Sequence, residues 1–243
     1  MLLGLDFDGT LSPIVEDPSK AELSLETQDI IKALAAIPGI SVAIVSGRSL
    51  QDVRGRVGID GLIYAGNHGL EIHGPGLSYL DPTAVKARRA LGWLAAALTK
   101  GLSQITGVIV ENKSLTLSVH CRQVAIEDRE TVFRHVQAAA AVAPDCFRIS
   151  VGKLVYEVCP QAHWHKGSAM RWIDGQIGRQ NTLTLYLGDD RTDEDAFRTL
   201  AHGITVKVGE PCETAATYHL DSPASVREFL YWLASLNQQG GQP

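Results

Sequence analysis

Residues 2–10 read LLGLDFDGT, an apolar run that ends in two aspartates separated by one residue and followed by glycine. A short apolar run without polar alternation is typical of a parallel strand that is buried on both faces. Gly9 allows the backbone to turn sharply directly after such a strand. Ligands of open α/β sheets bind beyond the carboxyl ends of the strands. We therefore expect Asp6 and Asp8 to lie at a ligand-binding edge.

The same pattern recurs along the chain, with helical patterns between the apolar runs. Further strands are predicted at Ile40–Val45, Leu62–Tyr64, Thr182–Leu187 and Ile204–Val208. Helices are predicted at Ser24–Ile37, Lys166–Ile177, Glu194–Leu200 and Ala224–Leu236. Apolar strands that alternate with helices indicate an α/β fold, with a Rossmann-like parallel sheet covered on both faces.

The middle of the chain has a different order of elements. Helices are predicted at Ala84–Lys100 and Ala125–Ala143, each followed by a pair of strands: Gly107–Glu111 with Leu115–Cys121, and Phe147–Val151 with Leu154–Cys159. This order predicts an α+β unit whose helices lie on one side of an antiparallel sheet. We assign residues 78–163 to this inserted unit, and residues 1–77 and 164–243 to the α/β core.

Composition and charge exclude several classes of protein. Of the 243 residues 45% are hydrophobic and 20% are charged, which is ordinary for a globular protein. The formal net charge of −5 leaves no global basic field for nucleic acid or an anionic membrane. The four cysteines form no CxxC pair, which argues against a zinc ribbon or a thioredoxin-like site. No signal peptide or membrane span is expected, so we predict a cytoplasmic monomer.

Carboxylates are concentrated after two of the predicted strands. Asp189, Asp190 and Asp193 follow the strand 182–187, as Asp6 and Asp8 follow the first strand. Clustered carboxylates repel one another unless a cation or protons neutralise them. A set of oxygen ligands without His or Cys favours a hard ion, and we predict Mg²⁺.

Each motif also has a purely structural interpretation. Asp-x-Asp-Gly is commonly a turn, Ser46-Gly47-Arg48 could be a helix cap followed by a surface arginine, and Lys166 could be a solvated helix residue. Their order favours function, because each lies at a strand end or a helix start, where backbone N–H groups attract anions. His163 and His165 flank Trp164 and are interpreted as hinge or surface residues.

The ordered set LDFDGTL (5–11), SGR (46–48), Lys166 and GDDRTDEDAF (188–197) resembles the four motifs of the haloacid dehalogenase superfamily of phosphohydrolases. The inserted unit resembles the α/β cap of that superfamily. GNHGLE (66–71) and VENKSLTLSVHCR (110–122) make the chain similar to trehalose-6-phosphate phosphatases. Two positions depart from that family: Cys121 replaces its usual Tyr, and Cys159 replaces a frequent Arg. Both lie in or beside the cap, so they bear on sugar specificity and not on the chemistry of the core.

The resemblance implies a covalent mechanism. Asp6 would be the nucleophile that forms an aspartyl-phosphate. Asp8 would be the general acid toward the leaving sugar oxygen and then the base for water. Ser46 and Lys166 would hold the phosphoryl oxygens, and Lys166 would also offset the charge of Asp6.

The resemblance also implies the ligand sets. Mg²⁺ would be held by Asp6, the backbone carbonyl of Asp8 and Asp189, with Asp193 behind them. The implied substrate-binding residues are Gly47, Arg48, His68, Glu71, Glu111, Lys113, Arg122 and Glu157. Each of the polar cap residues could instead be a solvent-exposed strand residue.

Three functions compete with hydrolysis of trehalose 6-phosphate. The same chemistry could act on sucrose phosphate or a glycosyl-glycerate phosphate. A non-catalytic phosphosugar sensor would be expected to have lost Asp6 or Asp8, and both are present. A sugar-phosphate mutase would have to shield its intermediate from water. The partner in every case is a small sugar phosphate.

Overall fold

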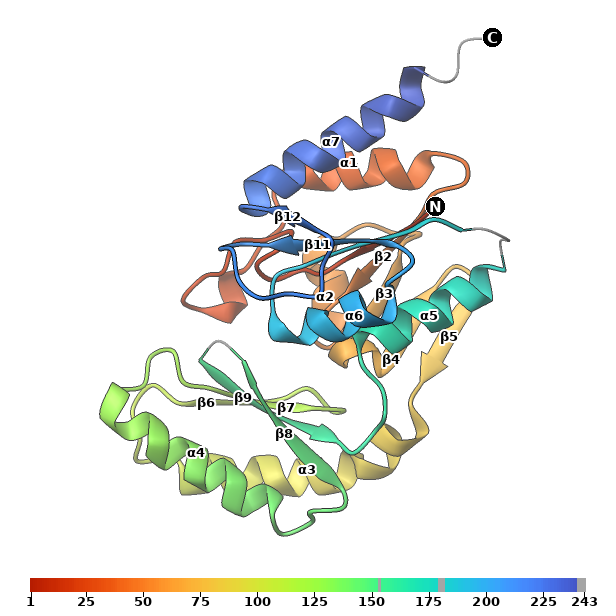
Figure 1. Ribbon diagram of the computed structural model, residues 1–243. Helices are drawn as coiled ribbons and strands as arrows, with labels where there is room; N and C mark the ends of the chain where they lie inside the picture. Colours follow the sequence, from red (N-terminus) through yellow and green to blue (C-terminus); the bar gives the residue numbers. More distant parts are fainter. Residues whose placement is uncertain (153, 179–181, 240–243) are drawn as a thin grey trace. The chain divides into compact units, whose positions relative to one another are not determined.

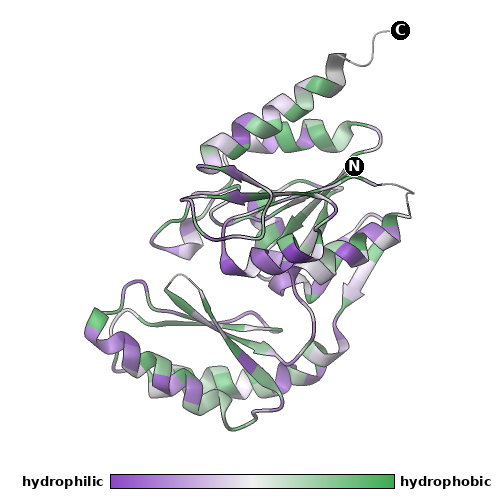
Figure 2. Ribbon diagram, in the orientation of Figure 1, coloured by the Kyte–Doolittle hydropathy of each residue, from purple (hydrophilic) through white to green (hydrophobic). Residues whose placement is uncertain are grey.

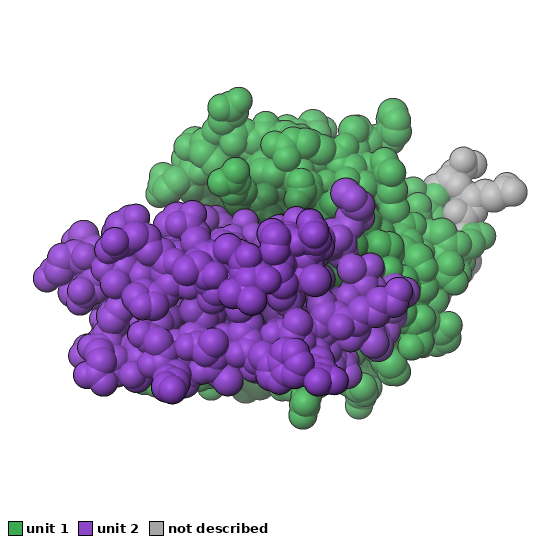
Figure 3. Space-filling model, turned by 90° about the horizontal axis from the view of Figure 1, so that it is seen from below, with its two compact units in different colours: residues 1–79, 164–243 green, residues 80–163 purple. Residues whose placement is uncertain are grey.

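The computed structural model describes residues 1–152, 154–178 and 182–239. The chain divides into two compact units, which Figure 3 shows in different colours. The first unit comprises residues 1–79 and 164–243, and the second comprises residues 80–163. The predicted boundary of the insert at residue 78 differs by two positions: residues 78 and 79 belong to the first unit and lie in the strand Leu77–Leu80, which extends its sheet.

An eight-stranded sheet forms the centre of the first unit (Figure 1). Its strands, in spatial order, are β12 (Tyr218–Leu220), β11 (Ile204–Val208), β10 (Thr184–Gly188), β1 (Leu2–Leu5), β2 (Ser41–Val45), β3 (Ile63–Gly66), β4 (Glu71–Gly74) and β5 (Leu77–Leu80). The neighbours from β12 to β3 pair in parallel, and β4 runs antiparallel to β3. The parallel α/β core predicted from the sequence is confirmed.

Helices cover both faces of this sheet because the strand residues alternate between two apolar clusters. Leu3 and Leu5 of β1 belong to the cluster that includes residues of α1 (Leu25–Ala36), α2 (Leu50–Val57) and α7 (Pro223–Gln239). Leu2 belongs to the opposite cluster, with residues of α5 (Lys166–Ile177) and α6 (Glu194–Thr199). In Figure 2 the strands β2 and β3 are coloured mainly as hydrophobic, as expected for strands buried on both faces.

The register of the strands places the predicted motifs at one edge of the sheet. Leu5 of β1 is paired with Leu187 of β10 on one side and with Ile44 of β2 on the other. Asp6 therefore follows β1 next to the segment after β10 that carries Asp189. The carboxyl end of β1 is thus flanked by the ends of β10 and β2.

The second unit contains a four-stranded antiparallel sheet in the order β6-β7-β9-β8 and two helices. Its elements are α3 (Pro82–Gly101), β6 (Ile109–Asn112), β7 (Leu117–His120), α4 (Ile126–Ala140), β8 (Phe147–Gly152) and β9 (Val155–Pro160). Leu117, Val119 and Val158 of the sheet share an apolar cluster with Leu91 of α3 and Val136 of α4. Both helices therefore pack on one face of the sheet, in the order of elements that the sequence predicts.

The short elements α2, β4, β5 and β12 have no counterpart among the strands and helices predicted from the sequence. Helix α2 begins after Ser49, whose side chain accepts a hydrogen bond from the backbone N–H of Asp52, and it ends at Gly58 in a left-handed conformation. Its mostly polar composition hides the two core residues, Val53 and Val57. Nowhere in the described ranges does a helix combine the length and the apolar character that crossing a bilayer requires.

Candidate active site

A buried ion-pair cluster lies at the carboxyl end of β1. Lys166, the first residue of α5, donates hydrogen bonds to Asp6 Oδ1 at 2.8 Å and to Asp193 Oδ1 at 2.9 Å. Thr10 Oγ1 donates to the other oxygen of Asp6 at 3.3 Å. The side chains of Lys166, Asp6 and Asp193 are 3%, 5% and 0% exposed, so water screens these charges little. The structure thus brings together three residues that the sequence separates widely.

Asp193 has three donors from the protein. Besides Lys166, Tyr186 donates its phenolic proton to Oδ1 at 2.7 Å, and the backbone N–H of Asp190 donates to Oδ2 at 3.0 Å. With both oxygens engaged in this way, Asp193 is suited to holding Lys166 in place.

Three carboxylates of this cluster offer an oxygen-only ligand set. Asp6, Asp189 and Asp193 each present an oxygen within 4.8 Å of those of the other two. Gly9 makes room for this set: its φ is +82°, and a Cβ at this position would lie 2.2 Å from Asp189 Oδ2. Lys207 donates a hydrogen bond to the backbone carbonyl of Asp189 and so anchors the loop after β10. Hard oxygen ligands without sulfur or imidazole fit Mg²⁺.

The cluster changes the proton affinities of its members. Burial raises the pKa of Asp6 well above its ordinary value, the charge of Lys166 opposes this rise, and Asp193 and Asp189 add to it. Burial alone would lower the pKa of Lys166, but the carboxylates of Asp193 and Asp6 outweigh it and raise that pKa. Burial and the charge of Asp193 raise the pKa of Tyr186, which therefore remains a donor. Lys166 is thus held as a cation beside the nucleophile candidate.

Ser46 and Gly47 follow β2 at the same edge. Ser46 is buried, and its Oγ accepts a hydrogen bond from the backbone N–H of Arg48 at 3.1 Å. The ring of His68 lies against Gly47, where a Cβ would approach within 2.6 Å of the ring. The backbone N–H of His68 donates to the carbonyl of Ser46 at 2.9 Å. The loop after β3 is therefore packed directly on the SGR motif.

Glu71 and Asn67 organise that loop. Glu71 Oε1 accepts hydrogen bonds from the N–H of Leu50 at 2.7 Å and from Asn67 Nδ2 at 2.7 Å. The φ angles of Asn67 and His68, +49° and +59°, lie in the left-handed region that is uncommon for residues with a Cβ. The carboxylate of Glu71 thus ties this strained turn to the start of α2.

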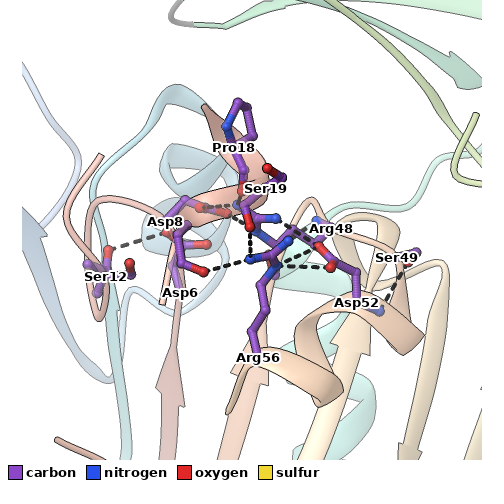
Figure 4. A network of polar contacts seen from close by, with 12 residues as sticks. Asp6, Asp8, Ser12, Pro18, Ser19, Arg48, Ser49, Asp52 and Arg56 are labelled. Carbon is purple, nitrogen blue, oxygen red and sulfur yellow. Dashed lines mark hydrogen bonds and ion pairs between the residues drawn. The ribbon is translucent and has the colours of Figure 1, made fainter. Parts of the chain in front are cut away.

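Asp8 is held by Arg48 and not by the buried cluster (Figure 4). Arg48 Nε donates to Asp8 Oδ2 and Nη2 donates to Asp8 Oδ1, both at 2.7 Å. Burial alone would lower the pKa of Arg48, but the hydrogen bonds and charges of Asp8 and Asp52 raise it, so Arg48 stays charged. The side chain of Asp8 is 41% exposed, which leaves it accessible to a substrate and to water.

The predicted sugar-binding residues lie in the second unit. Lys113 Nζ and Ser118 Oγ approach Glu157 Oε1 to 3.3 Å and 3.2 Å, although Lys113 and Glu157 are 44 residues apart. Glu111 Oε2 pairs with His120 Nε2 at 2.8 Å. Arg122 lies in the turn after β7. Glu111, Lys113 and Glu157 therefore take part in polar pairs within the second unit.

Cys121 and Cys159, the two positions that depart from the family pattern, lie in different surroundings. Cys121 is 1% exposed and belongs to the apolar core of the second unit. Cys159 lies two residues beyond Glu157 on β9, where side chains alternate between faces. Burial raises the pKa of Cys159 to about 12, so this thiol stays protonated. Of the two departures, only Cys159 shares a face with a predicted sugar ligand.

No sequence pattern indicated several residues that contact the site. Tyr186 lies within an apolar strand, and Lys207 lies in another, so neither stands out by pattern. Thr10 directly follows Gly9, and its hydroxyl is not part of any pattern that indicates a contact with Asp6. Asp52 could have been found, because Ser49 and Asp52 have the spacing of a capping residue and the third residue of a helix.

Sequence comparison identifies relatives over nearly the whole chain. The trehalose-phosphatase family model matches residues 4–224. A trehalose 6-phosphate phosphatase of Zea mays is 37% identical over 262 residues, which cover 100% of this chain and 71% of that protein. An uncharacterized glycosyl hydrolase of Mycobacterium tuberculosis is 39% identical over 249 residues, which cover 98% of this chain. The chain spans only 18% of that mycobacterial relative.

Solved structures share the fold. A crystal structure of a trehalose-6-phosphate phosphatase related protein superposes with a TM-score of 0.87 at 24% identity, over 99% of this chain and 100% of that chain. A haloacid dehalogenase-like hydrolase of B. subtilis superposes with a TM-score of 0.63 at 18% identity, over 94% of this chain and 98% of that chain. The fold is therefore that of the haloacid dehalogenase-like hydrolases. Because the family model matches most of its length, the chain belongs to the trehalose-phosphatase family, a family of phosphoric monoester hydrolases.

Proposed function

We propose that the protein is a Mg²⁺-dependent phosphatase that hydrolyses trehalose 6-phosphate to trehalose and phosphate. The proposal rests on the buried carboxylate of Asp6, which follows β1 and pairs with Lys166 at 2.8 Å beside Asp189 and Asp193. Membership of the trehalose-phosphatase family supports the same function.

The first chemical step would form an aspartyl-phosphate. A carboxylate oxygen of Asp6 attacks phosphorus, and the bond between phosphorus and the sugar oxygen breaks. That oxygen takes a proton from the carboxyl group of Asp8, so trehalose leaves as a neutral alcohol. The exposed side chain of Asp8 is consistent with contact to a leaving group.

The second step would return the enzyme to its starting state. A water molecule attacks phosphorus, its proton passes to the carboxylate of Asp8, and the bond between phosphorus and Asp6 breaks. Phosphate leaves, and Asp8 again carries the proton that the next cycle requires.

Charge stabilisation would provide most of the remaining rate acceleration. Lys166 Nζ and Ser46 Oγ would bind phosphoryl oxygens on which negative charge is spread in the transition state. Asp6, Asp189 and the backbone carbonyl of Asp8 would hold Mg²⁺, and Asp193 would act through Lys166. The ion would supply further positive charge toward the phosphoryl group.

We also propose that Glu111, Lys113, Arg122 and Glu157 contact the sugar. Glu157→Gln should lower kcat/KM for trehalose 6-phosphate by about tenfold or more, since a charge-assisted hydrogen bond contributes roughly 1.5–3 kcal/mol. An aryl phosphate has no sugar, so its kcat/KM should change little. Equal losses on both substrates would contradict a role in sugar binding.

The function is tested by phosphate release from a panel of sugar phosphates with Mg²⁺ and with EDTA. The panel contains the 6-phosphates of trehalose, sucrose and glucose and a glycosyl-glycerate phosphate. We expect the highest kcat/KM with trehalose 6-phosphate, loss of activity in EDTA and recovery with Mg²⁺. A higher kcat/KM for another sugar phosphate would identify that compound, and not trehalose 6-phosphate, as the substrate. Full turnover without metal would contradict the proposed Mg²⁺ ligands. The proposal includes the cytoplasmic monomer predicted from the sequence, which cell fractionation and size-exclusion chromatography test.

A further inference from the structure

Most N–H groups of the Arg48 guanidinium donate hydrogen bonds to other groups of this chain. Its guanidinium donates through Nε and Nη2 to the two oxygens of Asp8, through Nη1 to Asp52 Oδ2 at 2.7 Å, and through Nη2 to the carbonyl of Pro18 at 2.9 Å. A guanidinium has five N–H groups, so these contacts occupy four of them. The guanidinium also lies over the ring of Phe7, 5.5 Å from its centroid. Arg48 is therefore fixed by the fold before any substrate arrives.

Asp52 accepts a hydrogen bond from Nη1 of Arg48, and Arg56 in turn donates hydrogen bonds to Asp52. Arg56 Nε donates to Asp52 Oδ1 at 2.9 Å and to Oδ2 at 3.0 Å, one helical turn along α2. Arg56 Nη1 donates to the carbonyls of Ser19 and Ala21, at 3.0 Å and 2.6 Å. The backbone N–H of Asp52 donates to the helix cap Ser49 at 3.3 Å. Asp52 thus connects the start of α2, the loop after β1 and Arg48 (Figure 4).

We propose that Arg48 and Asp52 are positioning residues for Asp8: Arg48 orients the carboxyl group through two parallel hydrogen bonds, and Asp52 orients Arg48. This differs from the substrate-binding role that the family resemblance implies for Arg48. It assigns a function to Asp52, whose carboxylate contacts Arg48 and Arg56.

The proposal rests on the proposed function, because it concerns the residue that donates the proton to the leaving oxygen. Proton transfer requires the acid to lie within hydrogen-bond reach of that oxygen. A misplacement of about 1 Å can cost about a hundredfold in rate. A poor alkoxide leaving group depends on this proton, whereas a nitrophenolate leaves without it. Loss of positioning should therefore reduce the reaction of alkyl phosphates selectively.

The experiment compares Asp52→Asn with Asp60→Asn. Asp60 lies just beyond the end of α2 and pairs with Arg54 at 3.1 Å, but both side chains are exposed and the pair is separate from the Asp8 network. For each variant kcat/KM is measured with trehalose 6-phosphate and with p-nitrophenyl phosphate, because kcat/KM reports the steps up to formation of the phosphoenzyme. Thermal unfolding is recorded for each variant.

For Asp52→Asn we expect kcat/KM for the sugar phosphate to fall about tenfold, with less than about a threefold change for the aryl phosphate. The loss should appear in kcat and not in KM, and Asp52→Glu should restore most of it. Asp60→Asn should leave kcat/KM for both substrates unchanged. Arg48→Lys keeps the charge but not the planar fork, and it should show the same selectivity with a larger loss.

Two outcomes would overturn the inference. One is that Asp52→Asn behaves like Asp60→Asn, and the other is that it lowers kcat/KM equally for both substrates, as a purely structural defect would. Failure of the proposed function is distinguishable, because the wild-type protein itself would then release no phosphate from trehalose 6-phosphate.

Discussion

The ammonium group of Lys166 lies 2.8 Å from Asp6 Oδ1, although the two residues are 160 positions apart in the sequence. Asp6 directly follows the central strand β1 and Lys166 begins α5, so two separate elements must be placed correctly for this contact. Both side chains are almost completely buried. The contact therefore links the stability of the first unit to the chemistry proposed for it.

Asp6→Asn should abolish turnover while the fold is retained. The substitution keeps the volume and one acceptor oxygen but removes the nucleophile, and such a loss costs several orders of magnitude in rate. Phosphate release and thermal unfolding measure the two effects. Asp29→Asn is the control, because Asp29 forms an exposed pair with Lys32. Activity above a few per cent of wild type would exclude Asp6 as nucleophile.

Lys166→Met should destabilise the protein strongly. The variant leaves Asp6, Asp189 and Asp193 close together without their buried cation, and breaking a buried ion pair costs roughly 3–5 kcal/mol. Lys32→Met removes the exposed pair with Asp29 and should cost less than about 0.5 kcal/mol. Urea unfolding of the two variants gives the comparison. A similar free energy of unfolding for both variants would show that the buried pair stabilises the fold no more than the exposed pair does.

Gly9→Ala should lower activity more than its cost in stability explains. Gly9 and Gly39 both have positive φ angles, +82° and +92°, so alanine at either should cost about 1–2 kcal/mol. Only at Gly9 does the new Cβ meet another group, Asp189 Oδ2 at 2.2 Å, whereas nothing lies within 4 Å of a Cβ at Gly39. We expect a larger loss in thermal stability for Gly9→Ala, because Asp189 must also shift, and a loss of Mg²⁺-dependent turnover for Gly9→Ala alone. Equal activity of the two variants would place Asp189 outside the metal site.

Asp52 should contribute to stability at neutral pH but not in acid. Burial alone would raise the pKa of Asp52, but the hydrogen bonds and charges of Arg56 and Arg48 lower it below its ordinary value of 3.8. The unfolded chain therefore binds a proton at Asp52 at higher pH than the folded protein does, and this contribution is present above pH 3.8 and lost as the pH falls further. Urea unfolding between pH 3 and 6 should show a shallower acid decline for Asp52→Asn. An unchanged slope would mean that the ion pairs of Asp52 do not persist in solution.

The strand-end motifs were readable in the sequence because they are local. An apolar run that ends in Asp-x-Asp-Gly, Ser-Gly or Gly-Asp-Asp indicates both the strand and the turn after it, so Asp6, Ser46 and Asp189 are predicted at strand ends without coordinates. The short elements β4 and β12 were not found, because each contains polar residues and forms no apolar run. Helix α2 was missed because most of its residues are polar and only two reach the core.

What the sequence by itself determined is therefore the α/β core, the inserted α+β unit and the identities of the carboxylates at the sheet edge. The tertiary structure decided which of these groups are partners. Lys166 pairs with Asp6 and Asp193, whereas Asp8, only two residues from Asp6, pairs with Arg48. The physical reason is that successive residues after a strand diverge in direction, and the partner of each is supplied by whichever element packs beside it. No pattern in one segment encodes that packing, because it depends on distant residues meeting in the folded core.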